Sequence, residues 1–305
     1  SQLLAAVRTA SVPVLQHRAV LESAPMGTFA NSKQLAGASW NVLRSDRELL
    51  AIPVIGGAVC AVIAAVIGLV AYSTLETTTD VTTGTTSDQL NPAAGLLLII
   101  GLLIIAVISQ LFAGALVAGA NERFEGGDPT IGSSFSKAMT RLGPITGWTA
   151  TNATVGAVLN ALRDKAGFLG DLVVGMIGAA WNIATWLVMP VIIVEGVGPF
   201  AAVKRSVVLI KAKWGENIVA QVGFGLLGLL LIIPGVLVFG ALSAALPILG
   251  LPLLLIYLAI VFTVLAALGA VFRTALYRYA VGLPVGEAFS TPMLASSFGA
   301  KRTGR

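Results

Sequence analysis

Charged residues are scarce in this 305-residue sequence: only 11% are Asp, Glu, Lys or Arg, whereas 56% are hydrophobic. A soluble domain carries about 25% charged residues, because polar groups must cover its surface. The mean hydropathy is +0.91, and the apolar residues form runs of about 20 or more, the length that a helix needs to cross a bilayer. The composition therefore excludes a soluble globular protein and predicts an all-α, polytopic membrane helical bundle.

Cysteine and histidine are almost absent, since Cys60 and His17 are the single examples of each. One thiol forms no disulfide within the chain and no thiolate zinc site, and one imidazole makes histidine-based metal or acid–base chemistry improbable. The run 128–135, DPTIGSSF, lacks the lysine of a phosphate-binding loop. We therefore expect no catalytic residue, no cofactor, no metal site and no nucleic-acid partner.

Six apolar segments are predicted to span the membrane: residues 49–72, 92–120, 144–162, 172–194, 218–241 and 249–272. Pro234 lies within the fifth segment, and Pro247 and Pro252 lie near the start of the sixth. Because proline lacks an amide hydrogen and clashes with the preceding turn, we expect a kink or a short break at these positions.

The third segment is the most polar, and charge placement decides whether it crosses. Cytoplasmic loops carry the excess of Lys and Arg. With six spans, 17 of the 19 basic residues fall on one side and only Arg163 and Lys165 on the other. With five spans, the same residues divide ten against nine. The sequence therefore predicts six spans with both termini cytoplasmic, in the plasma (inner) membrane; the Ala, Gly and Val content is typical of a prokaryote.

Three regions are expected along the chain. Residues 1–25 are interpreted as an N-terminal extension outside the core, residues 26–290 as the transmembrane domain, and residues 291–305 as a basic cytoplasmic tail. The Thr-rich loop 73–91 is expected to be flexible, and the short connection 242–248 to be a tight hairpin.

A similar amphipathic stretch precedes the first, third and fifth segments, each with a tryptophan near the membrane: Trp40, Trp148 and Trp214. Such stretches are typical of helices that lie in the membrane interface. The third one carries four candidate contacts to anionic lipid: Lys204, Arg205, Lys211 and Lys213. Gly127-Asp-Pro129 follows the second segment and Gly282-Leu-Pro284 follows the sixth, both of which return the chain to the cytoplasmic side in the predicted topology. These similarities are consistent with a threefold internal repeat, or with similar selection at each place where the chain enters the membrane.

Polar residues inside the segments are uncharged. No Asp, Glu, Lys, Arg or His lies in the middle of any segment, which argues against an ion-coupled transporter. Thr149, Asn152 and Asn160 of the third segment are candidates for a polar lining, or for hydrogen bonds within the bundle. Asp46, Arg47 and Glu48 before the first span, with Glu195 after the fourth, favour an interfacial charge network over an enzyme site.

Small residues recur at four-residue spacing: Gly114/Ala118, Ala115/Gly119, Gly240/Ala244 and Ala266/Ala270. This spacing lets two helix backbones approach closely, and here it favours packing within the chain over a dimer face.

The motif SWNVLRSDRELLAIPVIG (residues 39–56) resembles a family of uncharacterised prokaryotic six-helix membrane proteins. The segment 198–235 is similar to the matching cytoplasmic helix and fifth span. It is also loosely similar to membrane regions beside some glycerophosphodiester phosphodiesterases, but this sequence has no counterpart of their soluble domain. The resemblance extends over most of residues 26–289, supplies no active-site residue and does not imply enzymatic activity.

These observations favour a non-enzymatic integral membrane protein that binds membrane lipids and other membrane-protein subunits. The alternative is a passive pore or carrier for a small or lipidic solute, lined by the third segment. An intramembrane enzyme is the third reading.

Overall fold

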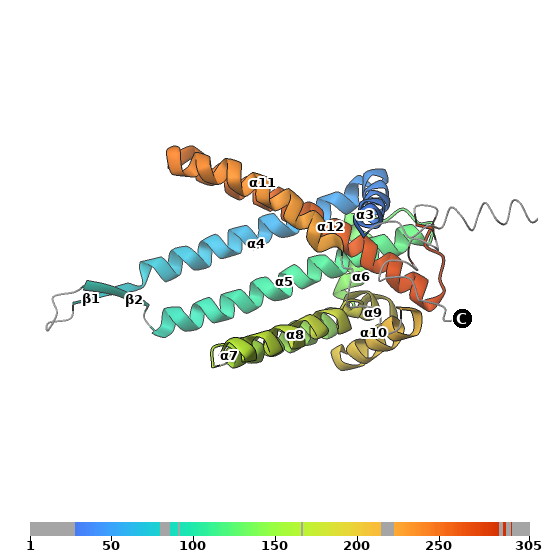
Figure 1. Ribbon diagram of the computed structural model, residues 1–305, viewed down its shortest axis with the longest axis horizontal. Coiled ribbons are helices and arrows are strands. Elements are labelled where there is room, and N and C mark those ends of the chain that lie inside the picture. Colours follow the sequence, from blue (N-terminus) through green and yellow to red (C-terminus); the bar gives the residue numbers. More distant parts are fainter. Residues whose placement is uncertain are drawn as a thin grey trace, which may run out of the picture.

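The computed structural model describes residues 28–79, 86–90, 92–165, 167–214, 223–286, 289, 290 and 294. Figure 1 shows long helices that run along the molecule and shorter ones gathered at one end. The elements are α3 (Thr28–Ser45), α4 (Arg47–Ser73), β1 (Leu75–Thr79), β2 (Thr86–Leu90), α5 (Pro92–Phe124), α6 (Ile131–Met139), α7 (Leu142–Arg163), α8 (Phe168–Ala184), α9 (Val188–Glu195), α10 (Pro199–Trp214), α11 (Gly223–Ala245) and α12 (Pro247–Val281).

Five helical stretches among the described residues are long and apolar enough to cross a membrane: Glu48–Ser73, Pro92–Phe124, Gly170–Glu195, Gly228–Ala245 and Pro247–Val281. Helix α7 is not among them, because the Thr and Asn residues of its sequence lower its hydropathy. Five of the six predicted spans therefore correspond to helical stretches that are long and apolar enough to cross a membrane, with small shifts at their ends. The chain has the architecture of a polytopic membrane protein.

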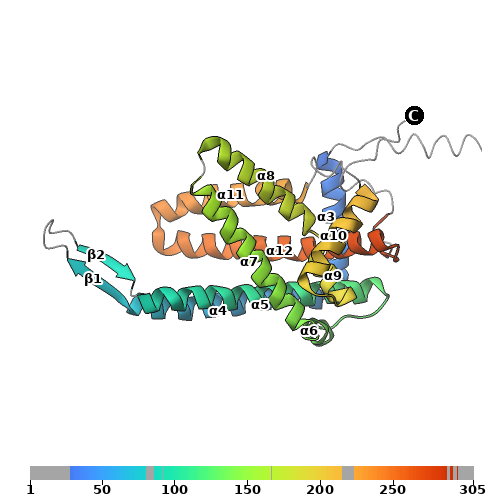
Figure 2. The same cartoon turned by 90° about the horizontal axis from the view of Figure 1, so that it is seen from below.

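The long helices form antiparallel pairs. Helices α4 and α5 lie side by side, as do α7 and α8, and α11 and α12 (Figure 2). Helix α12 also contacts α3, α4, α5, α9 and α10, which makes it the central helix of the fold. Leu246 alone joins α11 to α12, so the predicted tight hairpin is confirmed.

Within this otherwise all-helical chain, the loop at residues 73–91 that was predicted to be flexible contains two strands in the part that the structure describes. Strands β1 and β2 pair antiparallel, with Leu75 opposite Leu90 and Thr79 opposite Thr86. Threonine is β-branched and favours the extended backbone of a strand, which gives a physical reason for this hairpin. It continues from α4 and leads into α5, at what we call the hairpin end of the molecule (Figure 1).

Helices α3, α6, α9 and α10 gather at the opposite end, which we call the core end (Figures 1 and 2). The buried apolar core lies here, and it includes Leu43, Leu49, Ile145, Ile192 and Leu276. Small residues of α5 make close contact possible. A side chain on Gly119 would collide with Ser134 and Leu49, whereas one on Gly240 would meet nothing. Two of the predicted close-packing pairs, both on α5, thus pack within the chain.

The fourth predicted span is divided. Helix α8 ends at Ala184 and α9 begins at Val188. The Leu187 amide, at this junction, donates to Ser206 Oγ of α10 over 3.2 Å. The break is therefore stabilised by a neighbouring helix, a contact that the apolar run could not reveal.

Proline does not break α11. The helix runs through Pro234, and the Tyr257 hydroxyl of α12 donates to the Leu231 carbonyl over 2.6 Å. Pro247 opens α12 at its first turn, where the missing amide costs nothing.

The predicted threefold order is visible in the elements. A short helix (α3, α6 or α10) precedes each outgoing helix (α4, α7 or α11), and a returning helix follows. Glycines with positive φ follow the three returning helices: Gly126 at 85°, Gly196 at 72° and Gly282 at 82°. Only glycine adopts this backbone without strain, and it ends a helix sharply.

The predictions for the two termini fall largely outside the described residues. Residues 1–25 lie there entirely, and of residues 291–305 only Leu294 is described, with a buried side chain.

Candidate functional site: a carboxylate cluster at the core end

Two acidic side chains lie where α3 meets α4. Asp46 is the N-cap of α4, and its Oδ1 accepts the Glu48 amide over 3.1 Å. A carboxylate here satisfies a free amide and interacts favourably with the positive end of the helix dipole. Glu48 reaches away from α4, and its Oε2 accepts the amide of Ile131, the first residue of α6, over 2.7 Å.

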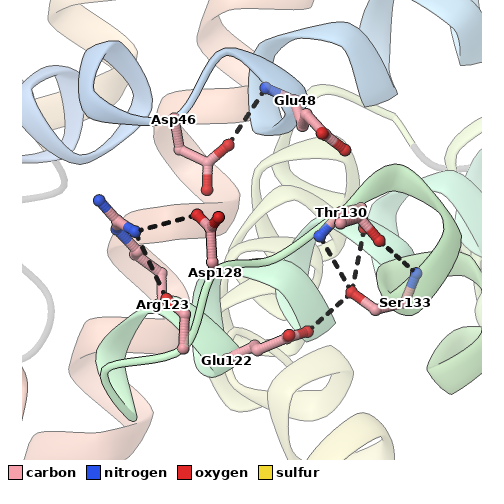
Figure 3. Close-up of polar contacts among 8 residues, drawn as sticks. Asp46, Glu48, Glu122, Arg123, Asp128, Thr130 and Ser133 are labelled. Atoms are coloured by element: carbon pink, nitrogen blue, oxygen red, sulfur yellow. Dashed lines mark hydrogen bonds and ion pairs between the residues drawn. The ribbon is translucent and has the colours of Figure 1, made fainter.

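The start of α6 forms a capping box (Figure 3). The Ser133 amide donates to Thr130 Oγ1 over 2.9 Å, and the Thr130 amide donates to Ser133 Oγ over 3.0 Å. The Ser133 hydroxyl in turn donates to Glu122 Oε2 of α5 over 2.9 Å. Glu48 and Glu122, from two different spanning helices, thus converge on one short helix.

The loop between α5 and α6 is held by Arg123. Its Nη1 lies 3.4 Å from Asp128 Oδ1 and 3.4 Å from the Gly127 carbonyl (Figure 3). Asp128 is almost fully exposed, at 96%. An ion pair in that setting contributes little to stability.

A cavity of about 400 Å³ adjoins the cluster, and Glu122, Glu125 and Lys137 contribute charge to its wall. Glu122 accepts from Ser133, and Glu125 accepts from Asn121 and Arg278. No group of three or more metal-ligating side chains occurs among the described residues. The carboxylates are thus engaged with helix ends and neighbouring side chains, an arrangement that anchors α6.

Arg278 forms a second network at the core end. Its side chain is only 3% exposed. Nη1 donates to Asn121 Oδ1 over 2.7 Å and to Glu125 Oε1 over 3.2 Å, and Nε donates to the Pro284 carbonyl over 2.7 Å. These bonds tie the end of α5 to the end of α12 and to the turn after it.

Glu195, at the end of α9, forms the third network. Its Oε1 accepts Arg205 Nε of α10 over 3.0 Å and the Tyr277 hydroxyl of α12 over 3.1 Å. Of the two places where the sequence predicted a charge network, Glu195 thus forms an ion pair, whereas Asp46 and Glu48 accept backbone amides. The Arg47 side chain lies outside the described part.

The family of unknown function DUF6159 matches residues 93–287, well over half of the chain. The chain belongs to this family. The match bears out the expectation of an uncharacterised family and does not bear on the loose phosphodiesterase resemblance. Comparison with curated proteins and with solved structures finds no match.

The candidate polar lining of this DUF6159 member lies on α7. The Thr149 side chain is buried, and its hydroxyl donates to the Ile145 carbonyl of its own helix over 2.9 Å. Asn152 Oδ1 accepts Trp181 Nε1 of α8 over 3.0 Å. Asn160 is exposed. The structure thus joins Asn152 to the neighbouring helix and brings the three residues to no common cavity among those described here.

The four candidate lipid contacts lie on α10, one side of which is buried through Ala202, Ser206 and Leu209. Arg205 pairs with Glu195, and Lys213 Nζ lies 5.4 Å from the centre of the Tyr279 ring. Lys204 and Lys211 are exposed. The four residues therefore divide into two that contact the protein and two that project outward.

Sequence reasoning missed Arg273. The predicted sixth span ends at residue 272, but α12 continues to Val281, so Arg273 lies within the helix. Its guanidinium carbon is 4.6 Å from the centre of the Trp186 ring, and the side chain lines a cavity between α4, α5 and α12. The sequence shows that Arg273 is a basic residue directly after an apolar run, but only the packing of the helices shows that its side chain faces inward.

Proposed function

We propose that this chain is a six-span membrane protein of the plasma membrane, with both termini cytoplasmic, and that it is a non-enzymatic accessory protein. Its partners would be membrane lipids and other membrane-protein subunits. One observation carries the proposal: in four of the five apolar helical stretches, no more than 11% of the most apolar window is buried within the chain. Exposed apolar surface of that extent requires lipid or another protein to cover it.

The core end supports the accessory role. Buried packing is concentrated where α3, α6, α9 and α10 meet, and the polar networks there tie helix ends to one another. An enzyme needs an acid and a base free to exchange protons with a substrate. Here Glu48, Glu122 and Glu195 accept hydrogen bonds from protein donors.

The arrangement of α7 supports the sixth span. Its 22 residues correspond to a length of about 33 Å at 1.5 Å per residue, enough to cross the hydrocarbon. It begins at the core end, where it contacts α5, α9 and α10, and it pairs with α8 (Figure 2). Arg163, at its far end, pairs with Asp171 of α8 over 2.8 Å.

The pore alternative has less support. The hydroxyl groups of Thr146, Thr149, Thr151 and Thr154 all donate to carbonyls of their own helix. A threonine hydroxyl that donates to a carbonyl of its own helix has no hydrogen left to donate to a solute.

Cysteine accessibility tests the topology. In a Cys60→Ala background, single cysteines replace Thr77, Lys137, Asp164 and Lys204. Six spans predict that an impermeant maleimide added outside the cell labels the cysteines at 77 and 164, while those at 137 and 204 need permeabilised cells. Labelling of 164 only after permeabilisation, together with 137, would remove the sixth span.

Native mass spectrometry tests the accessory role. The full chain is released from its own membrane into lipid nanodiscs without harsh detergent. We expect retained lipid or a second membrane protein in stoichiometric amount. A bare monomer with neither would contradict the proposal.

A further inference from the structure

A cavity of about 300 Å³ lies between α4, α5 and α12, with Met189 of α9 at its edge. This volume is at the lower limit of small-molecule sites. Its wall is largely apolar and includes Gly57 and Gly269, which leave room between the helices, and Gly56, against which Phe112 packs. Among its polar atoms, Cys60 Sγ and Ser109 Oγ satisfy each other at 3.4 Å.

Arg273 is the charged residue in this wall. Its Nε is buried and has no hydrogen-bond partner. No carboxylate of the described residues forms a salt bridge with it, in contrast to Arg278, which is paired with Glu125. Burying a cation without a partner is costly, so a counter-anion is expected beside it.

The Trp186 ring lies against the guanidinium, although Trp186 is not part of the cavity wall. Its Nε1 is also buried without a hydrogen-bond partner. Arg141 likewise has a buried Nε without a partner, but it is not part of this cavity wall. Arg273 therefore brings a buried, unpartnered donor into the cavity wall, and Trp186 beside it carries a second one outside the wall.

We propose that this cavity binds one anionic phospholipid, with its headgroup phosphate at Arg273 and an acyl chain along Gly56, Gly57 and Cys60. The order of the lining residues along the helices supports this orientation of the lipid. Arg273 lies toward the core end of α12, whereas Cys60 and Ser109 lie further toward the hairpin end on α4 and α5. A lipid of the inner leaflet has the same order, with the charged group at the surface and the chain in the hydrocarbon. The proposal rests on the membrane placement proposed above.

The direct test measures lipid binding by native mass spectrometry of the full-length chain in a neutral detergent. The probes are dioctanoyl phosphatidylglycerol, dioctanoyl phosphatidylcholine and inorganic phosphate. We expect one phosphatidylglycerol to bind at least about tenfold more tightly than phosphatidylcholine, which has the same chains but no net charge (tenfold corresponds to 1.4 kcal/mol). Equal binding of the two lipids would overturn the proposal. Competition by inorganic phosphate as effective as that by phosphatidylglycerol would identify a free-phosphate site and overturn it too.

Arg273→Gln is expected to lose at least about tenfold in phosphatidylglycerol affinity and to leave phosphatidylcholine binding unchanged. Arg44→Gln is the matched control, since Arg44 is an exposed basic residue at the end of α3 and does not line the cavity. Wild-type affinity in Arg273→Gln would overturn the proposal.

A second variant keeps the test decisive if Arg273→Gln does not fold. A side chain on Gly57 would meet only Thr263 Oγ1, at 3.9 Å, so Gly57→Leu fills the cavity without displacing backbone. Gly68→Leu, on the same helix in open space, is its control. We expect Gly57→Leu alone to weaken phosphatidylglycerol binding; unchanged binding would reject the cavity as the site. A negative result for lipid binding would not alter the labelling pattern in the cysteine-accessibility experiment. The cavity proposal and the proposed topology can therefore fail independently.

Discussion

Arg273 and Arg278 lie five residues apart on α12 and have opposite surroundings. Arg278 is nearly fully buried, and it donates to a side-chain amide, a carboxylate and a backbone carbonyl. Arg273 lies over an indole ring beside an apolar cavity, with a donor left unsatisfied. The Arg278 guanidinium therefore holds helices together, whereas the Arg273 guanidinium is free to bind an external anion.

Arg278→Met tests the structural role. The substitution leaves the Pro284 carbonyl and the Asn121 side-chain oxygen without their donor in a buried setting, so we expect a loss of about 3 kcal/mol in unfolding free energy. Chemical unfolding in detergent micelles measures it. Arg123→Met is the control, because Arg123 pairs with the exposed Asp128, and it should change stability by about 0.5 kcal/mol or less. Equal effects of the two variants would contradict this assignment.

At the scale of elements, the short helix α6 depends on its neighbours. It has only nine residues, too few for a stable isolated helix in water. Its first turn is capped from within by Thr130 and Ser133 and from outside by Glu48 and Glu122. Its position beside α5 therefore follows from polar contacts at its start as well as from burial of Ala138 and Ser134.

Ser133→Ala removes half of the capping box and the bond to Glu122, so we expect it to destabilise the core end by about 1 kcal/mol. Ser136→Ala, an exposed position on the same helix, should be close to neutral. Hydrogen exchange of the α6 amides would locate the effect, with faster exchange in Ser133→Ala only. The same exchange rate in both variants would show that the capping contacts do not hold α6 in place.

The whole molecule is asymmetric between its two ends. Basic residues of α6 and α10 lie at the core end, while Arg163 lies at the far end of α7. Apolar side chains such as Leu69, Leu102, Leu237 and Ile248 are exposed along the long helices. The core end carries the charge and the buried packing, and the long helices expose apolar side chains. This distribution is consistent with a protein whose core end meets the surface of the inner leaflet.

The double variant Lys204→Gln/Lys211→Gln tests this surface contact. Each exposed lysine should contribute about 1 kcal/mol of attraction to anionic lipid, so the variant should recruit fewer phosphatidylglycerol molecules in mixed-lipid nanodiscs. Arg163→Gln, at the other end, should recruit as many as the wild type. The single tightly bound lipid expected at Arg273 should persist in the double variant, which distinguishes surface attraction from the cavity. No change in lipid recruitment would contradict a surface role for Lys204 and Lys211.

The sequence by itself determined the membrane class, the five helical stretches long and apolar enough to cross a membrane, and the short helices α3, α6 and α10. Each depends on a local property: an apolar run of sufficient length, or an amphipathic stretch with basic residues. The tight hairpin predicted at residues 242–248 depends on the same property, because only a short connection separates two apolar runs.

Only the tertiary structure decided the pairing of β1 with β2, the break between α8 and α9, and the inward position of Arg273. The Leu187 amide is satisfied by Ser206, 19 residues away, and Arg278 by Asn121, 157 residues away. Such contacts depend on which helices become neighbours, and that is set by packing across the whole chain, where glycines such as Gly119 allow close approach. Composition shows that a polar group is present, but its partner is chosen only when the chain folds.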